Sequence, residues 1–216
     1  MNIGNSLTSL KQTLPEKAIL VAVSKTKPIE AILEAYSAGH RVFGENKIQE
    51  MVSKWETLPK DIEWHMIGHV QTNKVKYMAP FVSLIHAIDS EKLLEEIQKQ
   101  GAKNNRIISG LIQVRIAKEE TKFGAKPEAV KPLLEYAEKC PNLLIDGLMG
   151  MASFTSDENQ IRKEFSSLAE IYSSLQQQFP KLKYLSMGMS GDYTIALELG
   201  SNMIRVGSKI FGERNY

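Results

Sequence analysis

In "ILVAVSKTKP", residues 19–28, an unbroken apolar run stops at two lysines and a proline. A continuous apolar run of this length is typical of a strand covered on both faces, as in a parallel sheet. Pro28 stands where a helix would begin, because proline suits the first turn of a helix. The stretch therefore predicts a buried strand, then a helix, with Lys25 at the end of the strand.

The same pattern recurs along the chain. Short apolar runs of strand length alternate with longer stretches in which apolar residues recur at helical spacing, as in 48–55 and 161–175. Ser90 and the polar run 155–157 offer helix caps after two of the predicted strands. The eight predicted strands are "ILVAVSK" (19–25), "RVFGEN" (41–46), "EWHMIG" (63–68), "SLIHAID" (83–89), "GLIQVRIA" (110–117), "IDGLMGMA" (145–152), "KYLSMGM" (183–189) and "NMIRVGSKIF" (202–211).

Eight alternating units favour a closed barrel. Strands that alternate with helices predict a parallel sheet with right-handed crossovers. Eight such units in 216 residues match the length of a small (β/α)8 TIM barrel, and they favour it over an open doubly wound α/β sheet. No linker rich in Gly, Pro or Ser divides the chain, so we expect a single domain over residues 1–216.

Composition narrows the classes of partner. The 27 basic and 25 acidic residues leave a net charge of +2, which argues against a nucleic-acid partner or a polybasic membrane surface. Cys140 is the only cysteine, so no internal disulfide can form. Neither a secretory signal nor an apolar run long enough for a membrane helix is present. These features predict a soluble cytoplasmic protein.

The barrel prediction directs attention to the ends of the strands, because barrel enzymes carry their functional residues there. Lys25 follows an apolar strand, so its stem would be desolvated, and a neutral amine can form a Schiff base with a carbonyl compound. The alternative is that Lys25 and Lys27 simply end a strand and reach water. Lys27 is the weaker candidate because it precedes Pro28 and so belongs to the turn.

The last two predicted strands end in small residues. "SMGMSGD" (186–192) and "RVGS" (205–208) place glycine and serine where backbone N–H groups could hold a phosphate, as the corresponding loops of many barrel enzymes do. The alternative is that these glycines serve tight turns. Arg205 lies inside the eighth strand, where it would either pair with a carboxylate such as Glu45 or Glu198 or point into the barrel mouth as a hydrogen-bond donor.

"HMIGH" places His65 and His69 close together and raises the question of a metal site. A third ligand is missing, because the sequence has neither a helical H-E-x-x-H pattern nor a cysteine nearby. Histidine at a strand end is commonly packed or hydrogen-bonded. We therefore expect no metal.

Several motifs in order resemble one family. "AVSKTKP", "FGEN", "WHMIGHVQTNK", "HAID", "GLMGM" and "LSMGMSGDYTIALELGSNMIRVGSKIFG" look like the pyridoxal phosphate homeostasis protein family, whose members resemble the N-terminal barrel of alanine racemase. The resemblance covers about Ile19 to Arg214 and implies a (β/α)8 barrel that binds pyridoxal 5′-phosphate (PLP). It also implies a site whose residues are Lys25 (Schiff base with the cofactor), Asn46, His65, Met187, Ser190, Arg205, Gly207 and Ser208.

The roles follow the family pattern. Ser190, Gly207 and Ser208 match positions that hold the phosphate, and Arg205 matches an arginine that faces the pyridine nitrogen. Lys122, in "KEETKFG" (118–124), resembles a loop lysine that could help receive or release the cofactor, or is simply solvated. His69 and Val70 depart from many relatives and put only the local loop shape in doubt.

Two functions from different classes remain open. The resemblance implies a non-catalytic protein that buffers PLP and passes it to PLP-dependent apoenzymes. The alternative is a PLP-dependent amino-acid racemase. An arginine at the pyridine nitrogen weakens the cofactor as an electron sink, and the chain ends at Tyr216 with no second racemase domain to supply another base. We therefore expect a monomeric PLP carrier and not an enzyme.

Overall fold

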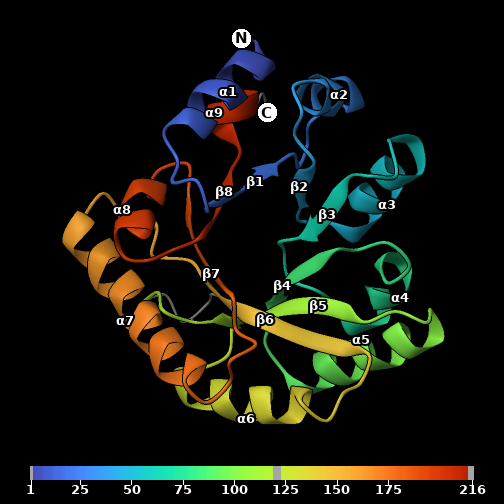
Figure 1. The fold of residues 1–216 in the computed structure, drawn as a ribbon, viewed down its shortest axis with the longest axis vertical. Coiled ribbons are helices and arrows are strands. Elements are labelled where there is room, and N and C mark those ends of the chain that lie inside the picture. The colour runs from blue at the N-terminus through green and yellow to red at the C-terminus, as the bar shows by residue number, and fades with distance from the viewer. Residues whose placement is uncertain (1, 119–122, 214–216) are drawn as a thin grey trace.

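The computed structural model describes residues 2–118 and 123–213. Its centre is a closed parallel barrel in which the strands follow one another in sequence order (Figure 1). The barrel closes where β1 pairs with β8, with Val21 opposite Arg205. The predicted (β/α)8 barrel is therefore confirmed. The strands are β1 (Ile19–Val23), β2 (Val42–Glu45), β3 (Glu63–Met66), β4 (Leu84–Ile88), β5 (Ile108–Val114), β6 (Leu143–Gly150), β7 (Tyr184–Met189) and β8 (Met203–Val206).

Helices surround the barrel, as Figure 1 shows. The first, α1, packs against the last, α9, so the beginning and end of the described chain lie side by side. The helices are α1 (Ile3–Gln12), α2 (Ile29–Ser37), α3 (Ile48–Thr57), η1 (Thr72–Lys74), α4 (Val75–Met78), α5 (Glu91–Lys103), α6 (Pro127–Ala137), α7 (Glu158–Gln176), α8 (Tyr193–Glu198) and α9 (Ser208–Phe211).

The predicted helix starts are largely confirmed. Pro28 is the N-cap of α2, and its extended backbone ends the turn that carries Lys25. The Asp157 side chain caps α7 by accepting hydrogen bonds from the N–H groups of the two residues that follow Glu158. Ser90 occupies the N-cap of α5 in an extended conformation, and its side chain makes no capping bond.

Two apolar cores lie on either side of the barrel wall. The outer core fills the space between strands and helices and contains large buried side chains such as Phe43, Trp64 and Phe165. The inner core fills the barrel with side chains such as Val21, Leu111 and Met203. Strands covered on both faces explain the continuous apolar runs of the sequence.

Several predicted strands run a few residues past their observed ends, and the eighth is much too long. The prediction extended the eighth strand to residue 211, whereas β8 ends at Val206 and Ser208–Phe211 forms α9. The Gly207 carbonyl accepts hydrogen bonds from the N–H groups of Ile210 and Phe211, and these bonds begin the helix. A short alternation of polar and apolar residues fits a strand and a single helical turn equally well.

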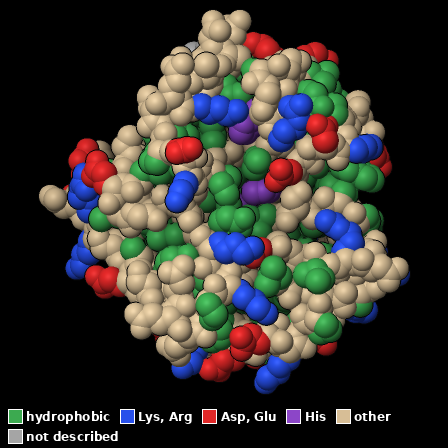
Figure 2. All heavy atoms as spheres, in the orientation of Figure 1, with side chains coloured by type: hydrophobic (Ala, Val, Ile, Leu, Met, Phe, Trp, Pro, Cys, Tyr) green, Lys and Arg blue, Asp and Glu red, His purple; other side chains and the backbone are tan. Residues whose placement is uncertain are grey.

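The surface carries both signs of charge. Figure 2 shows basic and acidic side chains interspersed over the viewed face of the molecule. None of the helices within 2–118 and 123–213 is both long enough and apolar enough to cross a bilayer.

Candidate functional site

A cavity of about 490 Å³ lies where the carboxyl ends of several strands meet. Its walls come from the segments that follow β1, β2, β3, β6, β7 and β8. Because all strands run parallel, these ends share one rim of the barrel. Six of the eight predicted site residues line the cavity: Lys25, Asn46, Ser190, Arg205, Gly207 and Ser208.

The other two predicted site residues lie elsewhere. Met187 is on β7 and fully buried, and His65 is on β3 and buried inside the barrel. Neither is among the residues that line the cavity. Lys122 lies outside the described residues.

The turn after β1 presents two lysines to the cavity. The Lys27 Nζ donates hydrogen bonds to the carbonyl oxygens of Phe211, Gly212 and Glu213, at 3.0, 3.1 and 3.1 Å. Its three donors are therefore all used to fix the end of α9. This arrangement agrees with the prediction that Lys27 belongs to the turn, and Lys25, which also lines the cavity, stays the candidate reactive amine.

The ends of β7 and β8 meet through a hydrogen bond. The Gly207 N–H donates to the Ser190 Oγ at 3.2 Å, which brings a hydroxyl to the start of α9. The Met189 N–H donates to the Asp192 Oδ1 at 2.6 Å and closes the turn that carries Ser190. Backbone N–H groups in the first turn of a helix have no partner within the helix. The Ser190 hydroxyl accepts from Gly207 and keeps its own proton to donate, and it lines the cavity together with Ser208. This arrangement suits a phosphate group.

Gly188 is required at the bend before Ser190. Its φ of +92° is a left-handed conformation that side chains rarely adopt. An added Cβ would also lie 2.7 Å from the Cβ of Ala196 and 2.8 Å from the Cα of Tyr193. For this glycine, the tight-turn interpretation and the phosphate-loop interpretation are compatible, because the turn is what places Ser190 at the rim.

Arg205 reaches the cavity from inside the barrel. It donates to the Ser186 carbonyl at 3.0 Å, to the Ser186 Oγ at 2.6 Å and to the Gly150 carbonyl at 3.0 Å. Of the two alternatives that the sequence left open for Arg205, the pairing with Glu45 or Glu198 is wrong, because Glu45 pairs with Lys54 and Glu198 pairs with Arg162. The observed arrangement is the other one, in which Arg205 lines the cavity as a donor. Burial lowers the pKa of Arg205 to about 10, with the charge of Asp192 acting in the opposite direction. The guanidinium therefore stays charged at neutral pH.

A chain of hydrogen bonds continues from Arg205 into the barrel. The Ser186 Oγ lies 3.4 Å from the His86 Nδ1, and the His86 Nε2 lies 3.0 Å from the His65 Nδ1. Burial lowers the pKa of His65 to about 3, helped by the charge of His40, and burial also holds the pKa of His86 well below its ordinary value. Both rings are therefore neutral at physiological pH.

The two histidines of "HMIGH" lie in different surroundings, His65 buried in the barrel and His69 nearer the surface. His69 lies 3.8 Å from the Asp89 carboxylate and stacks on Phe123 with 4.0 Å between ring centroids. Over 2–118 and 123–213 there is no group of three or more His, Cys, Asp or Glu side chains that could hold a metal ion.

The donor set of the cavity suits an anionic carbonyl compound. Lys25 is an amine, Arg205 is a fixed cation, and the Ser190–Gly207 region supplies neutral donors. The Asn46 Oδ1 is buried and has no hydrogen-bond partner in the described part of the chain, although Asn46 lines the cavity. A buried acceptor of this kind is costly unless a ligand donates to it. A ligand with an aldehyde, a ring and a phosphate fits these groups.

Sequence reasoning missed three residues of this region: Ser186, His86 and Lys54. Ser186 and His86 lie inside predicted strands, and an inward direction for them follows only from the observed register. Lys54 is 6% exposed although it is a lysine on a helix. Lys54 lies four residues after Glu50 and three after Met51, and residues three and four apart share a helix face. This spacing could have indicated that Lys54 faces the interior beside them.

Comparison with known proteins gives one consistent family. The model of the alanine racemase N-terminal domain matches residues 2–215. A pyridoxal phosphate homeostasis protein of Aquifex aeolicus is 44% identical over 92% of this chain and 88% of its own length. The protein of that name from Bos taurus is 40% identical over 91% of this chain and 77% of its own length.

Solved structures agree with the family comparison. PipY of Synechococcus elongatus without PLP is 35% identical, covers 97% of this chain and 100% of its own, and superposes with a TM-score of 0.93. The same protein with PLP bound gives a TM-score of 0.89 over the same coverage. Alanine racemase of Clostridium difficile, at 14% identity and a TM-score of 0.85, covers 100% of this chain and 57% of its own and shares the fold.

These matches confirm the resemblance that the sequence motifs indicated. The chain therefore belongs to the alanine racemase N-terminal domain family and, within it, to the pyridoxal phosphate homeostasis proteins.

Proposed function

We propose that this protein binds PLP in the rim cavity through Lys25 and serves PLP homeostasis by buffering the cofactor and passing it to apoenzymes. The observation that carries the proposal is the convergence of Lys25, Arg205 and the Ser190–Gly207 donors on one cavity. The homeostasis proteins of Aquifex and cattle and the PLP-bound PipY structure support it.

Each group has a role that its chemistry suits. The Lys25 amine would hold the aldehyde end of the cofactor, and the hydroxyls of Ser190 and Ser208 with the Gly207 backbone would hold the phosphate. Arg205 would lie on the side of the ring nitrogen, and Asn46 would accept a hydrogen bond from the ligand. Met187 and His65 would shape the site from behind its walls. When bound, PLP supplies an electron sink, which is strongest with a protonated ring nitrogen.

The proposal favours a carrier over a racemase. Arg205 is a permanent donor at neutral pH and therefore opposes protonation of the ring nitrogen. Racemisation also needs a second acid–base group near the substrate. Two other ionisable side chains at the cavity are occupied, since Lys27 is held by three carbonyls and Asp192 accepts the Met189 N–H. We further propose a single-domain cytoplasmic monomer.

The test is to add PLP to the purified protein, reduce it with borohydride and map the modified peptide by mass spectrometry. The expected result is one phosphopyridoxyl group on Lys25, absent from Lys25→Ala and retained in Lys131→Ala, a matched change at an exposed lysine of α6. Modification spread over several lysines would contradict the proposal. Turnover of L-alanine that disappears in Lys25→Ala would favour the racemase.

A further inference from the structure

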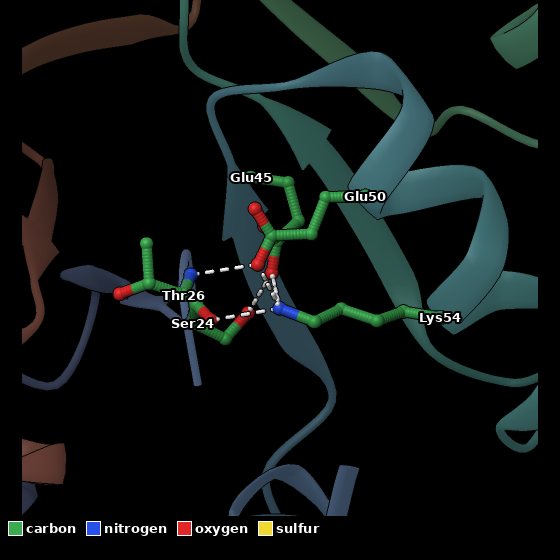
Figure 3. Close-up of polar contacts among 5 residues, drawn as sticks. All are labelled: Ser24, Thr26, Glu45, Glu50 and Lys54. Carbon is green, nitrogen blue, oxygen red and sulfur yellow. Dashed lines mark hydrogen bonds and ion pairs between the residues drawn. The ribbon is translucent and has the colours of Figure 1, made fainter. Parts of the chain in front are cut away.

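A buried cluster of charge lies directly beneath the Lys25 turn, on the outer side of the barrel wall. Figure 3 shows Glu45 from the end of β2 and two side chains of α3, Glu50 and Lys54, converging on Ser24 and Thr26. Ser24 and Thr26 are the residues on either side of Lys25. The cluster therefore touches both neighbours of the candidate reactive residue.

Lys54 is the centre of the cluster. Its Nζ donates to the Glu45 Oε1 at 2.8 Å, to the Glu50 Oε1 at 2.7 Å and to the Ser24 carbonyl at 2.9 Å. An ammonium group has three donors, so each has an acceptor. The Lys54 side chain is only 7% exposed and that of Glu45 is fully buried. A buried ion pair of this kind contributes little to the net free energy of folding. Stability alone therefore does not account for the cluster.

The carboxylates of Glu45 and Glu50 hold the Lys25 turn on both sides of Lys25. The Ser24 Oγ donates to the Glu45 Oε1 at 2.6 Å, which fixes the turn at its start. The Thr26 N–H donates to the Glu50 Oε1 at 2.6 Å, which fixes it after Lys25. Both bonds have an ionised acceptor and belong to the stronger class of hydrogen bonds.

Thr26 is held in an uncommon backbone conformation. Its φ is +63°, in the left-handed region that a β-branched residue rarely adopts. Such a conformation persists only where surrounding contacts enforce it, and it is often found beside functional residues. The bond from the Thr26 N–H to Glu50 supplies one such contact. Without the cluster, the turn would be free to relax and to change the direction of the residue before Thr26.

We propose that Glu45, Glu50 and Lys54 form a positioning clamp that fixes the Lys25 turn and thereby sets how readily the Lys25 amine captures an aldehyde. The clamp residues do not line the cavity, so they act through the backbone of Ser24 and Thr26. The inference deepens the proposed function and rests on it for the identity of the aldehyde.

The test compares three variants with the wild-type protein. Glu50→Ala removes the acceptor of the Thr26 N–H at a side chain that is already 24% exposed, so the fold should survive. Lys54→Met removes the centre of the clamp. Val130→Ala is the matched control, because Val130 is fully buried on α6 and makes a purely apolar cavity when shortened. Each variant is measured for thermal unfolding, for hydrogen exchange at the Thr26 amide, and for the rate of borohydride-trapped PLP attachment to Lys25.

The clamp predicts faster exchange at Thr26 in both clamp variants, measured without PLP. It also predicts that attachment to Lys25 slows by about tenfold or more, since misplacing a reacting group by ~1 Å can cost roughly 100-fold. Val130→Ala should lower the unfolding temperature and leave attachment at the wild-type rate. Attachment that stays at the wild-type rate in Glu50→Ala and Lys54→Met would overturn the clamp while leaving the proposed function intact.

Two other results would be decisive. If Val130→Ala slows attachment as much as Lys54→Met does at equal loss of unfolding temperature, the effect is one of stability and the clamp is overturned. If the wild-type protein itself attaches no PLP to Lys25, the proposed function fails and the clamp fails with it.

Discussion

Two buried cations near the cavity, Lys54 and Arg205, have different kinds of hydrogen-bond partner. Lys54, outside the barrel wall, meets two carboxylates, whereas Arg205, inside it, donates to two carbonyl groups and a hydroxyl. The positive charge of Lys54 is therefore compensated within the protein, and that of Arg205 is available to the cavity that it lines. The difference separates a cation that holds the backbone from one whose charge is directed at the cavity.

The largest expected effect comes from breaking the compensated pair. Lys54→Met should lower the free energy of unfolding by about 3–5 kcal/mol, because it leaves the carboxylate of Glu45 buried without its cation. Urea unfolding at pH 7 measures the change. Adding Glu45→Leu to Lys54→Met should recover much of the loss, since no buried charge then remains. A double variant no more stable than Lys54→Met would contradict this account of the pair.

Lowering the pH should reduce the free energy of unfolding through His65, inside the barrel, and should have the opposite effect through Glu45 of the clamp. The pKa of His65 is lowered to about 3, so the folded state binds fewer protons than the unfolded state, whose histidine titrates near 6.5. The stability that His65 contributes is present above pH 6.5 and is lost as the pH falls toward 3, by about 3 kcal/mol at pH 4.5.

The measurement is the free energy of unfolding against pH, for the wild type and for His65→Gln. The variant should show a shallower fall below pH 6.5, because its side chain does not titrate. Burial raises the pKa of Glu45, so that group has the opposite sign, and its stability contribution grows as the pH falls through the raised pKa. Equal slopes in the two proteins would show that His65 is not buried in its neutral form.

A smaller effect is expected where Arg205 loses one of its uncharged partners. Ser186→Ala removes the hydroxyl that accepts from Arg205 at 2.6 Å and lies 3.4 Å from the His86 Nδ1. The loss should be about 1–3 kcal/mol in the free energy of unfolding, because a hydrogen bond to a charged group is lost in a buried place. Ser173→Ala, at an exposed serine of α7, should have no measurable effect. A Ser186→Ala protein as stable as the wild type would contradict the assigned contact.

We expect the smallest change in stability at an exposed ion pair. Lys131 and Glu135 lie on α6, 3.9 Å apart and more than half exposed. Lys131→Ala should change the free energy of unfolding by about 0.5 kcal/mol or less, because exposed pairs gain little in water. If Lys131→Ala lowered the free energy of unfolding as much as Lys54→Met does, burial would not explain the difference between the two lysines.

The sequence predicted the barrel well because its apolar runs are local and periodic. Runs such as 19–25 reveal a buried strand without knowledge of any partner. The end of β8 was placed wrongly, since Ile210 and Phe211 fit a strand or a helical turn equally well. Local pattern determines the type of element better than it determines the element's end.

The site was predicted unevenly for a related reason. Lys25 and Arg205 stood out as candidates because Lys25 follows an apolar run and Arg205 lies inside one. The contact of Arg205 with Ser186 was not predicted, because Ser186 is brought to it only by the pairing of β7 with β8. Lys54 was missed because a lysine on a helix is usually exposed, and its burial depends on Glu45 from another element. Contacts between distant elements are not visible in local pattern.

A crystal structure of the protein grown with PLP would test directly whether Lys25 holds the cofactor in the rim cavity. We expect electron density that continues from the Lys25 Nζ into the cofactor, with the phosphate at Ser190 and Gly207 and the ring nitrogen facing Arg205. Density for PLP attached to another lysine, or a phosphate placed away from the β7 and β8 ends, would contradict it.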